Sequence, residues 1–180
     1  GGILDPANGA WFLNMEAGYT NMAIEGNASN SGQEYVSLGN GSEISSTRVH
    51  RYDPVTNSYL SDGAPIPVPI DDHVQCVWRD SLIYVVTGWS NNGNVPNVQI
   101  YDTYNDSWQV GTSTPNTNQF ISFGASGIII GDTIYYNGGA AGSFSFSSRP
   151  YLRKGIIDAN NPTNITWTQD MDNPGDAGYR

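Results

Sequence analysis

One stretch of the chain decides the fold: Asp80-Ser-Leu-Ile-Tyr-Val-Val-Thr-Gly88, followed by Tyr101-Asp102 and then by Trp108. Its apolar, β-branched run closed by glycine is typical of a buried strand that ends in a turn. The same features occur 49 residues earlier, as Tyr35-Val-Ser-Leu-Gly39, Tyr52-Asp53 and Tyr59. A single offset shared by separate motifs indicates an internal repeat.

Two further copies of the repeat are recognisable. A third copy begins with Tyr135-Tyr-Asn-Gly-Gly139, 51 residues after the matching Tyr84, and continues with Ile157-Asp158 and Trp167. A partial copy comes first, because Leu4-Asp-Pro-Ala-Asn-Gly-Ala-Trp11 matches residues 52–59 at an offset of 48. The repeat therefore covers nearly the whole chain.

The period, the glycine after an Ile-Tyr strand, the Tyr-Asp pair and the aromatic residue six positions after the Asp resemble the kelch repeat. The double glycine of that repeat is intact only at Gly138-Gly139, and the other copies have Leu38-Gly39 and Thr87-Gly88. The resemblance implies an all-β fold in which each repeat is a four-stranded antiparallel blade around a central channel. The WD40 repeat would have a period near 40 residues and a Trp-Asp pair, which this chain lacks.

We therefore expect about three complete blades and one partial blade. The strands of a blade, named a to d in chain order, are expected in the best copy at 73–78, 82–87, 98–102 and from Trp108 onward, with a tight turn at 79–81. The expected divisions are the end of a blade at 1–17, blades at 18–60, 73–110 and 119–169, and the lead-in to a next blade at 170–180.

The number of blades also predicts what completes the ring. Kelch rings usually have six or seven blades, so a ring needs roughly 300 residues or more. A half ring would expose an apolar blade face and strand edges to water, which proteins avoid. We therefore expect the remaining blades to come from the same longer chain or from another subunit.

Composition narrows the class of partner. The chain has 17 Asp+Glu and 7 Lys+Arg, a formal net charge of -10, which argues against a nucleic-acid partner because such partners bind basic patches.

No apolar run approaches the roughly 20 residues that cross a bilayer. The low charged content, the single Lys154 and the many Asn and Ser residues favour an extracellular or periplasmic, secreted protein. The lone Cys76 lies in an apolar stretch and is expected to be a buried, inert thiol.

The long loops are the expected binding surface. In an up-and-down blade, the long d–a and b–c loops lie at one end and the short a–b and c–d turns at the other. Binding residues favour loops held on a rigid scaffold, and aromatic side chains suit sugar or protein faces. We interpret the chain as a non-catalytic module that binds a protein or carbohydrate, with these candidate residues: Asp72, His73, Trp89, Phe144, Phe146 and Arg149.

Three of these residues also have a structural interpretation. His73 stands where kelch repeats often place a structural histidine before strand a. Phe144 and Phe146 can pack within their own loop. The acidic pairs Asp71-Asp72 and Asp170-x-Asp172 match no EF-hand spacing and are interpreted as solvated turns, so no metal is expected.

The alternative function is part of a kelch-type enzyme acting on sugars. A galactose oxidase-like copper site would need two histidine ligands, and this chain has only His50 and His73, of which His50 falls in a strand c away from the channel. A sialic acid epimerase-like site would need only polar groups at the channel mouth, where Asp72, His73 and Arg149 could serve. We expect no cofactor and assign no catalytic residue on this segment.

Overall fold

The computed structural model describes residues 3–4, 11–12, 15–16, 19–20, 33–35, 43–45, 47–49, 51–53, 58–90, 93–142 and 147–172. All regular structure in these residues is β-strand, as the repeat predicts. The chain divides into two compact units, residues 1–71 and residues 72–180.

In the first unit, four short strands form one antiparallel sheet, here called the N-terminal sheet, in the order β1-β2-β7-β8. Its strands are β1 (Ile3–Leu4), β2 (Trp11–Phe12), β7 (Arg51–Asp53) and β8 (Ser58–Tyr59). Two hairpins are inserted between β2 and β7: β3 (Met15–Glu16) with β4 (Tyr19–Thr20), and β5 (Gln33–Tyr35) with β6 (Glu43–Ser45).

This pairing differs from the division expected at residue 17. Trp11 pairs with Tyr52, so one sheet contains strands from both sides of that boundary. The segment around Tyr35, expected as strand b of the blade at 18–60, pairs with β6 instead.

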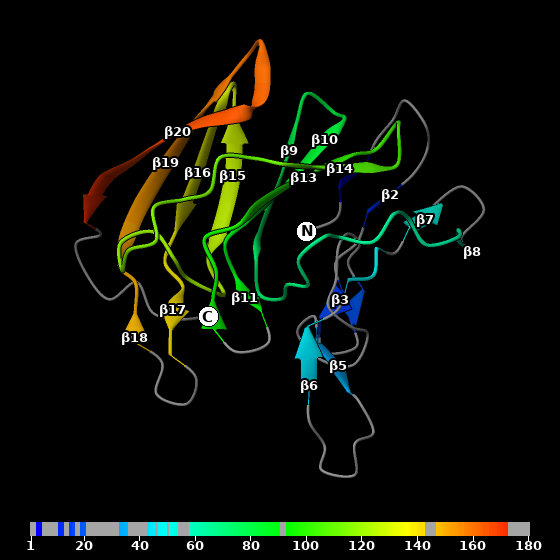
Figure 1. The fold of residues 1–180 in the computed structure, drawn as a ribbon, viewed down its shortest axis with the longest axis horizontal. Coiled ribbons are helices and arrows are strands. Elements are labelled where there is room, and N and C mark those ends of the chain that lie inside the picture. The colour runs from blue at the N-terminus through cyan, green and yellow to red at the C-terminus, as the bar shows by residue number, and fades with distance from the viewer. Residues whose placement is uncertain are drawn as a thin grey trace. The chain divides into compact units, whose positions relative to one another are not determined.

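The second unit contains two four-stranded antiparallel sheets (Figure 1). The central sheet has the order β14-β13-β10-β9, and the C-terminal sheet has the order β15-β16-β19-β20. The central strands are β9 (Val74–Trp78), β10 (Leu82–Val86), β13 (Val98–Asp102) and β14 (Ser107–Val110). The C-terminal strands are β15 (Ser126–Ile130), β16 (Thr133–Asn137), β19 (Tyr151–Asp158) and β20 (Asn161–Asp172).

The expected strands of the central sheet are confirmed to within one residue. Strand c was expected at 98–102 and is β13, and the expected turn at 79–81 joins β9 to β10. The long b–c loops carry small hairpins: β11 (Trp89–Ser90) with β12 (Gly93–Asn94), and β17 (Ala140–Ala141) with β18 (Ser147–Ser148).

The central and C-terminal sheets pack face to face through an apolar core. Side chains alternate along a strand, so one face of each sheet supplies the core. The central sheet contributes Val74, Cys76, Trp78, Tyr84, Val86, Val98 and Ile100, and the C-terminal sheet contributes Ile134, Tyr136, Ile157 and Ile165. Burial raises the pKa of Cys76 to about 12, which agrees with the inert thiol expected from the sequence.

Three hydrogen bonds join the two sheets across this core. Trp78 Nε1 donates to Asp132 Oδ1 at 2.9 Å, and the Tyr84 hydroxyl donates to the Pro162 carbonyl at 2.7 Å. Trp167 Nε1 donates to the Thr112 carbonyl at 2.9 Å. Trp167, the aromatic residue that closes this copy of the repeat, thus has an apolar ring and a polar tip whose hydrogen bond is satisfied, as large buried aromatics require.

The Tyr-Asp pair sets the c–d turn. Asp102 Oδ1 accepts hydrogen bonds from the backbone N–H groups of Tyr104 and Asn105 at 2.9 and 3.0 Å, which is an Asx turn. Burial raises the pKa of Asp102, but the hydrogen bonds from Asn105 and Tyr104 together lower it by more than burial raises it. The pKa of Asp102 is therefore below its ordinary value. Asp158 makes a similar side-chain hydrogen bond in the turn between β19 and β20, where its Oδ1 accepts from the N–H of Asn160 at 2.9 Å.

Candidate functional site

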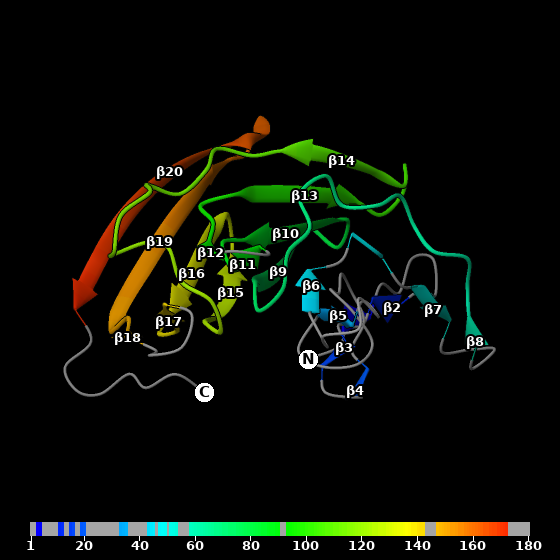
Figure 2. The same ribbon diagram turned by 60° about the horizontal axis from the view of Figure 1, so that its bottom comes forward.

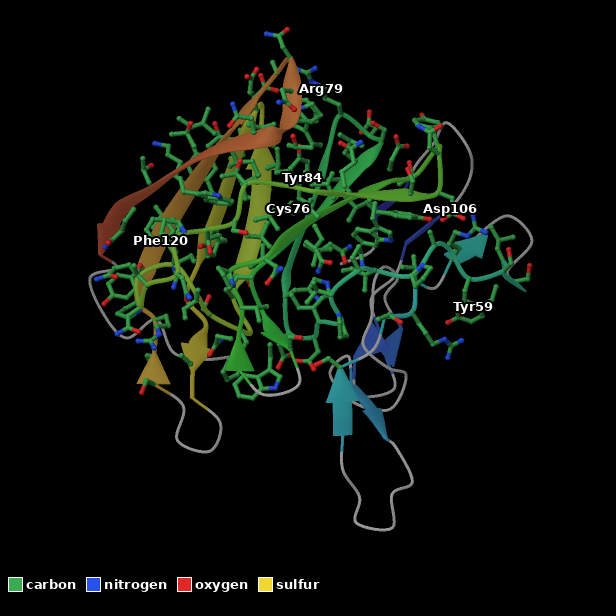
Figure 3. The ribbon with its side chains drawn as sticks, viewed as in Figure 1. Tyr59, Cys76, Arg79, Tyr84, Asp106 and Phe120 are labelled. Carbon is green, nitrogen blue, oxygen red and sulfur yellow. The ribbon has the colours of Figure 1, made fainter. Side chains whose placement is uncertain are left out.

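Three connecting segments of the second unit meet at one end of its sheets, here called the loop end. They are the d–a loop at 111–125 and the hairpins β11–β12 and β17–β18 (Figures 1 and 2). The tight turn that carries Arg79 lies at the opposite end (Figure 3). The expected sorting of long loops and short turns therefore holds in this unit.

Thr87 joins the d–a loop and the segment after β12 to the end of β10. It stands where the double glycine of the repeat would have its first glycine, and it adopts a positive φ of 49°. Its Oγ1 lies 2.9 Å from the Val95 carbonyl and 3.1 Å from the Ser122 carbonyl, and it accepts from the Ser122 N–H at 3.1 Å. These hydrogen bonds offset the strain of a β-branched residue at positive φ, and they explain this departure from Gly-Gly.

The C-terminal sheet holds the d–a loop from the other side. The Tyr136 hydroxyl donates to the Phe120 carbonyl at 2.8 Å. Phe123 and Ala140 exchange two backbone hydrogen bonds of 2.9 Å, which fasten the loop to the β17–β18 hairpin. The loop is therefore long but anchored at several points, as a preorganised binding loop requires.

Arg153 is a fully buried guanidinium beneath this loop. Its Nε donates to the Gln119 carbonyl at 2.5 Å and its Nη1 to the Gly138 carbonyl at 2.7 Å, and it lies 4.9 Å from the Tyr136 ring centroid. Burial lowers the pKa of Arg153 to about 10, so it stays charged at neutral pH. Arg153 joins the d–a loop to strand β19, and its role is structural.

Trp89 is the aromatic candidate that the structure places at this end. It begins β11, is half-buried, and meets the Phe123 ring edge to face, with centroids 5.6 Å apart. Phe123 in turn bridges to Ala140 of the neighbouring hairpin. The indole is therefore in contact with the d–a loop on one side, while the Trp89 side chain remains partly accessible.

Asp72 and His73 lead into β9 beside the same loop. Asp72 has a positive φ of 47°, and its carbonyl accepts from the Gly124 N–H at 2.8 Å. His73 Nε2 lies 3.4 Å from Gln75 Oε1, and its buried Nδ1 has no hydrogen-bond partner among the described residues. Asp71, the preceding residue, belongs to the first unit, where its Oδ2 accepts from Ser45 Oγ at 2.8 Å.

His73 makes stability depend on pH. Burial lowers its pKa from 6.5 to about 4, against a weaker opposing effect of the Gln75 hydrogen bond. The folded state thus binds fewer protons than the unfolded state between these values. We expect full stability above about pH 6.5 and a loss of up to about 3 kcal/mol as the pH falls to 4.

Urea unfolding of the natural chain and of His73→Gln between pH 7 and pH 4 measures this effect. The glutamine variant should lose less stability over that range, because its side chain does not titrate. Equal losses in the two proteins would show that His73 titrates alike in the folded and unfolded states.

Arg149 links the two loops of the C-terminal sheet. Its N–H donates to the Gly139 carbonyl at 2.9 Å, its Nη2 lies 3.4 Å from Asn118 Oδ1, and its Nε has no hydrogen-bond partner among the described residues. The remaining candidates, Phe144 and Phe146, lie outside the described residues. The structure thus brings Asp72, Trp89 and Arg149 around one segment, 118–124, with His73 adjacent in sequence.

The exposed surface of this segment is polar and uncharged. Asn116, Thr117, Asn118 and Gln119 are all exposed, and so are Ser147 and Ser148 of the neighbouring hairpin. Among the residues that the structure describes, no group of three or more His, Cys, Asp or Glu side chains could hold a metal ion. The chemistry offered here is hydrogen bonding from hydroxyls and amides beside one aromatic ring and one guanidinium.

Sequence reasoning missed the residues that hold the site. Thr87, Phe123 and Arg153 were not singled out, yet they anchor the loop end. Only Arg153 gave a signal, since an arginine inside the apolar run 151–157 is costly unless its donors are satisfied. The roles of Thr87 and Phe123 depend on segments that are distant in sequence.

Comparisons with known proteins agree with this architecture. No family model matches the chain. It is 24% identical to Kelch-like protein 36 of Bos taurus over 126 residues, which are 70% of this chain and 19% of that protein. Among solved structures, it resembles YjhT with a TM-score of 0.70 and 16% identity, over 96% of this chain and 51% of YjhT. The fold is that of a kelch-type β-propeller.

The central and C-terminal sheets are therefore neighbouring blades, and the loop end is the blade end where their long connections gather. The chain spans about half the length of YjhT and about a fifth of Kelch-like protein 36. In the described part of the chain, no helix is long and apolar enough to cross a membrane.

Proposed function

We propose that this kelch-type segment is a non-catalytic module that binds a carbohydrate or a protein through its loop end, in an extracellular or periplasmic setting. The observation that carries the proposal is the half-buried Trp89, which meets Phe123 of the d–a loop edge to face, in a loop whose residues 116–119 expose hydroxyls and amides. Hydroxyl and amide groups beside an aromatic face suit a neutral, hydroxyl-rich ligand, so a carbohydrate is favoured over a protein surface.

The anchoring of the d–a loop supports binding over a purely connecting role. Thr87, Tyr136 and the Phe123–Ala140 bridge hold the loop from both sheets, which lowers the ordering cost of binding. Arg149 adds a charged donor beside Asn118 that can donate to a hydroxyl, a carbonyl or a carboxylate of the ligand.

An array of immobilised oligosaccharides, followed by calorimetry with a hit, tests this function. Trp89→Ala should weaken binding by about tenfold or more, because a buried aromatic anchor contributes most at such sites. The matched control is Tyr104→Ala, since Tyr104 is a 60% exposed aromatic in the c–d turn at the opposite end; it should leave binding unchanged.

Three outcomes separate the alternatives. Unchanged binding in both Trp89→Ala and Arg149→Ala would exclude the loop end as the site. Binding of displayed protein segments and of no oligosaccharide would favour the protein ligand. A sugar recovered in altered form would favour the enzyme alternative.

A further inference from the structure

Two arginines of the loop end, Arg149 and Arg153, contact the same two segments and are here called the arginine pair. Each of them hydrogen-bonds within residues 118–119 of the d–a loop and within the double glycine at 138–139. Burial lowers the pKa of Arg153 most, and the positive charge of Arg149 lowers it further. The two guanidinium groups therefore lie close enough to share one ligand.

Both arginines keep a donor that no described residue accepts. Arg153 is fully buried, and its Nη2 has no hydrogen-bond partner among the described residues. The buried Nε of Arg149 likewise has none. The anchoring of the d–a loop uses only Nε and Nη1 of Arg153, so it does not account for these donors. A buried donor on a charged group is costly unless an acceptor lies against it.

No carboxylate among the described residues forms an ion pair with either arginine. The ion pairs in this part of the chain join Arg48 to Asp62 and Arg79 to Asp132. Acidic side chains are not scarce, because the chain has 17 Asp+Glu and 7 Lys+Arg. Two positive charges in a partly buried place repel each other unless an anion lies between them. The arginine pair is therefore suited to an anion from outside the described residues.

The double glycine leaves room beside the arginine pair. Gly138 accepts a hydrogen bond from Arg153 and is buried, yet a Cβ atom added to it would meet nothing within 4 Å. At Gly139, by contrast, an added Cβ would lie 2.7 Å from the Phe123 carbonyl oxygen. Unfilled space beside a buried residue is uncommon in a packed interior. Arg149 is only half-buried, so a small ligand can approach the pair from the surface of the loop end.

We propose that the arginine pair binds the carboxylate group of a small ligand. The two oxygens of a carboxylate match the two unpaired donors, Nη2 of Arg153 and Nε of Arg149, and hydrogen bonds between guanidinium and carboxylate groups are strong. A phosphate has more oxygens than these two donors can satisfy, and a halide offers a single centre. The carboxylate comes from a free small acid or from an acidic sugar. The first source is independent of the proposed function, whereas the second rests on it and adds an acidic group to its hydroxyl-rich ligand.

Titration of the natural chain with acetate, followed by nuclear magnetic resonance of isotope-labelled arginine side chains, tests the proposal. The Nε–H signals of the arginine pair should shift and saturate. Acetamide, which has nearly the same shape but no charge, should shift neither signal. Arg149→Gln should weaken acetate binding at least about tenfold, because it removes one of the two charged donors.

Arg79→Gln is the matched control for this substitution. Arg79 is an exposed arginine in the tight turn at the opposite end, so its replacement should leave acetate binding unchanged (Figure 3). Arg153→Lys keeps the charge but loses the planar fork of donors, and it should also weaken binding. Unchanged circular dichroism and melting temperature would show that Arg149→Gln is folded.

Glucuronate and glucose, which differ by one carboxylate, identify the source of the group. Glucuronate that binds at least about tenfold more tightly than acetate, with the excess lost in Trp89→Ala, would assign the carboxylate to an acidic sugar. Equal affinities of glucuronate and acetate would assign it to a free small acid.

Three results would overturn the inference: no saturable shift with either carboxylate, chloride competing as well as acetate, or undiminished acetate binding in Arg149→Gln. A neutral oligosaccharide that still binds in such a case would leave the proposed function of the loop end standing. Acetate binding by a chain that binds no sugar would leave this inference standing alone.

Discussion

Replacing Trp78 with alanine is expected to lower the free energy of unfolding of the second unit by about 3–5 kcal/mol. Trp78 is only 4% exposed, lies between the central and C-terminal sheets, and meets Tyr84 edge to face at 6.4 Å. Its removal would leave a cavity in the core and would deprive Asp132 of the Nε1 donor. Urea unfolding followed by circular dichroism measures the loss.

Trp78→Phe separates packing from hydrogen bonding at this position. Phenylalanine keeps an aromatic ring in the core but cannot donate to Asp132, so its cost should be about 1–2 kcal/mol. A loss below about 1 kcal/mol in Trp78→Ala would contradict a close contact between the two sheets.

The second large effect is expected at Gly155, where Gly155→Ala should destabilise the fold by about 3 kcal/mol. A Cβ atom at this position would clash with Trp167 Cζ3 and would lie 2.7 Å from Cε3 and Cη2. The Trp167 ring cannot move away easily, because its Nε1 donates a hydrogen bond to the Thr112 carbonyl. The ring also packs edge to face with Tyr136, with ring centroids 6.0 Å apart. Thermal unfolding gives the difference.

Gly93→Ala is the matched control for this substitution. It makes the same chemical change in the β11–β12 hairpin, where an added Cβ would meet nothing within 4 Å. The two glycine variants should therefore differ by at least about 2 kcal/mol. If they are equally stable, the close packing of Trp167 on strand β19 is wrong.

The strands of the central sheet could be predicted because their signals are local. Each strand has its own local signal: the run 82–87 is one strand, Tyr101-Asp102 ends the next, and Trp108 begins the last. The repeat supplies their order. The chemistry assigned to the Asp was also local, since the Asx turn of Asp102 involves residues two and three positions away. Local signals of this kind survive in a divergent repeat.

The first unit was harder to predict because its signals conflict. The Leu4-Asp-Pro and Trp11 match suggested strands c and d, whereas β1 and β2 occupy the first two positions of the N-terminal sheet. Motif similarity compares residue types, but strand order also depends on which apolar pairs find each other. Tyr35, expected in strand b, pairs locally with β6 instead.

That the candidate residues bind a ligand stays a prediction, and the residues that anchor the loop around them could not be predicted. Asp72, Trp89 and Arg149 were chosen because they fall in long loops, and the structure places all three around residues 118–124. The anchors are Thr87, which contacts Ser122 across 35 residues, and Tyr136, which reaches Phe120 across 16 residues. No sequence pattern encodes such contacts, because they arise only once neighbouring blades are packed.

An engineered disulfide tests whether the central and C-terminal sheets are adjacent blades packed face to face. The Thr112 N–H donates to the Thr163 carbonyl at 2.8 Å, so the two backbones are in contact. Thr112→Cys with Thr163→Cys should therefore oxidise to a disulfide, seen as a mobility shift on a non-reducing gel. Tyr104→Cys with Ser148→Cys, a pair from opposite ends, should not form one. Cross-linking of the first pair alone is the predicted result, and absence of that cross-link, or equal cross-linking of both pairs, would contradict the account.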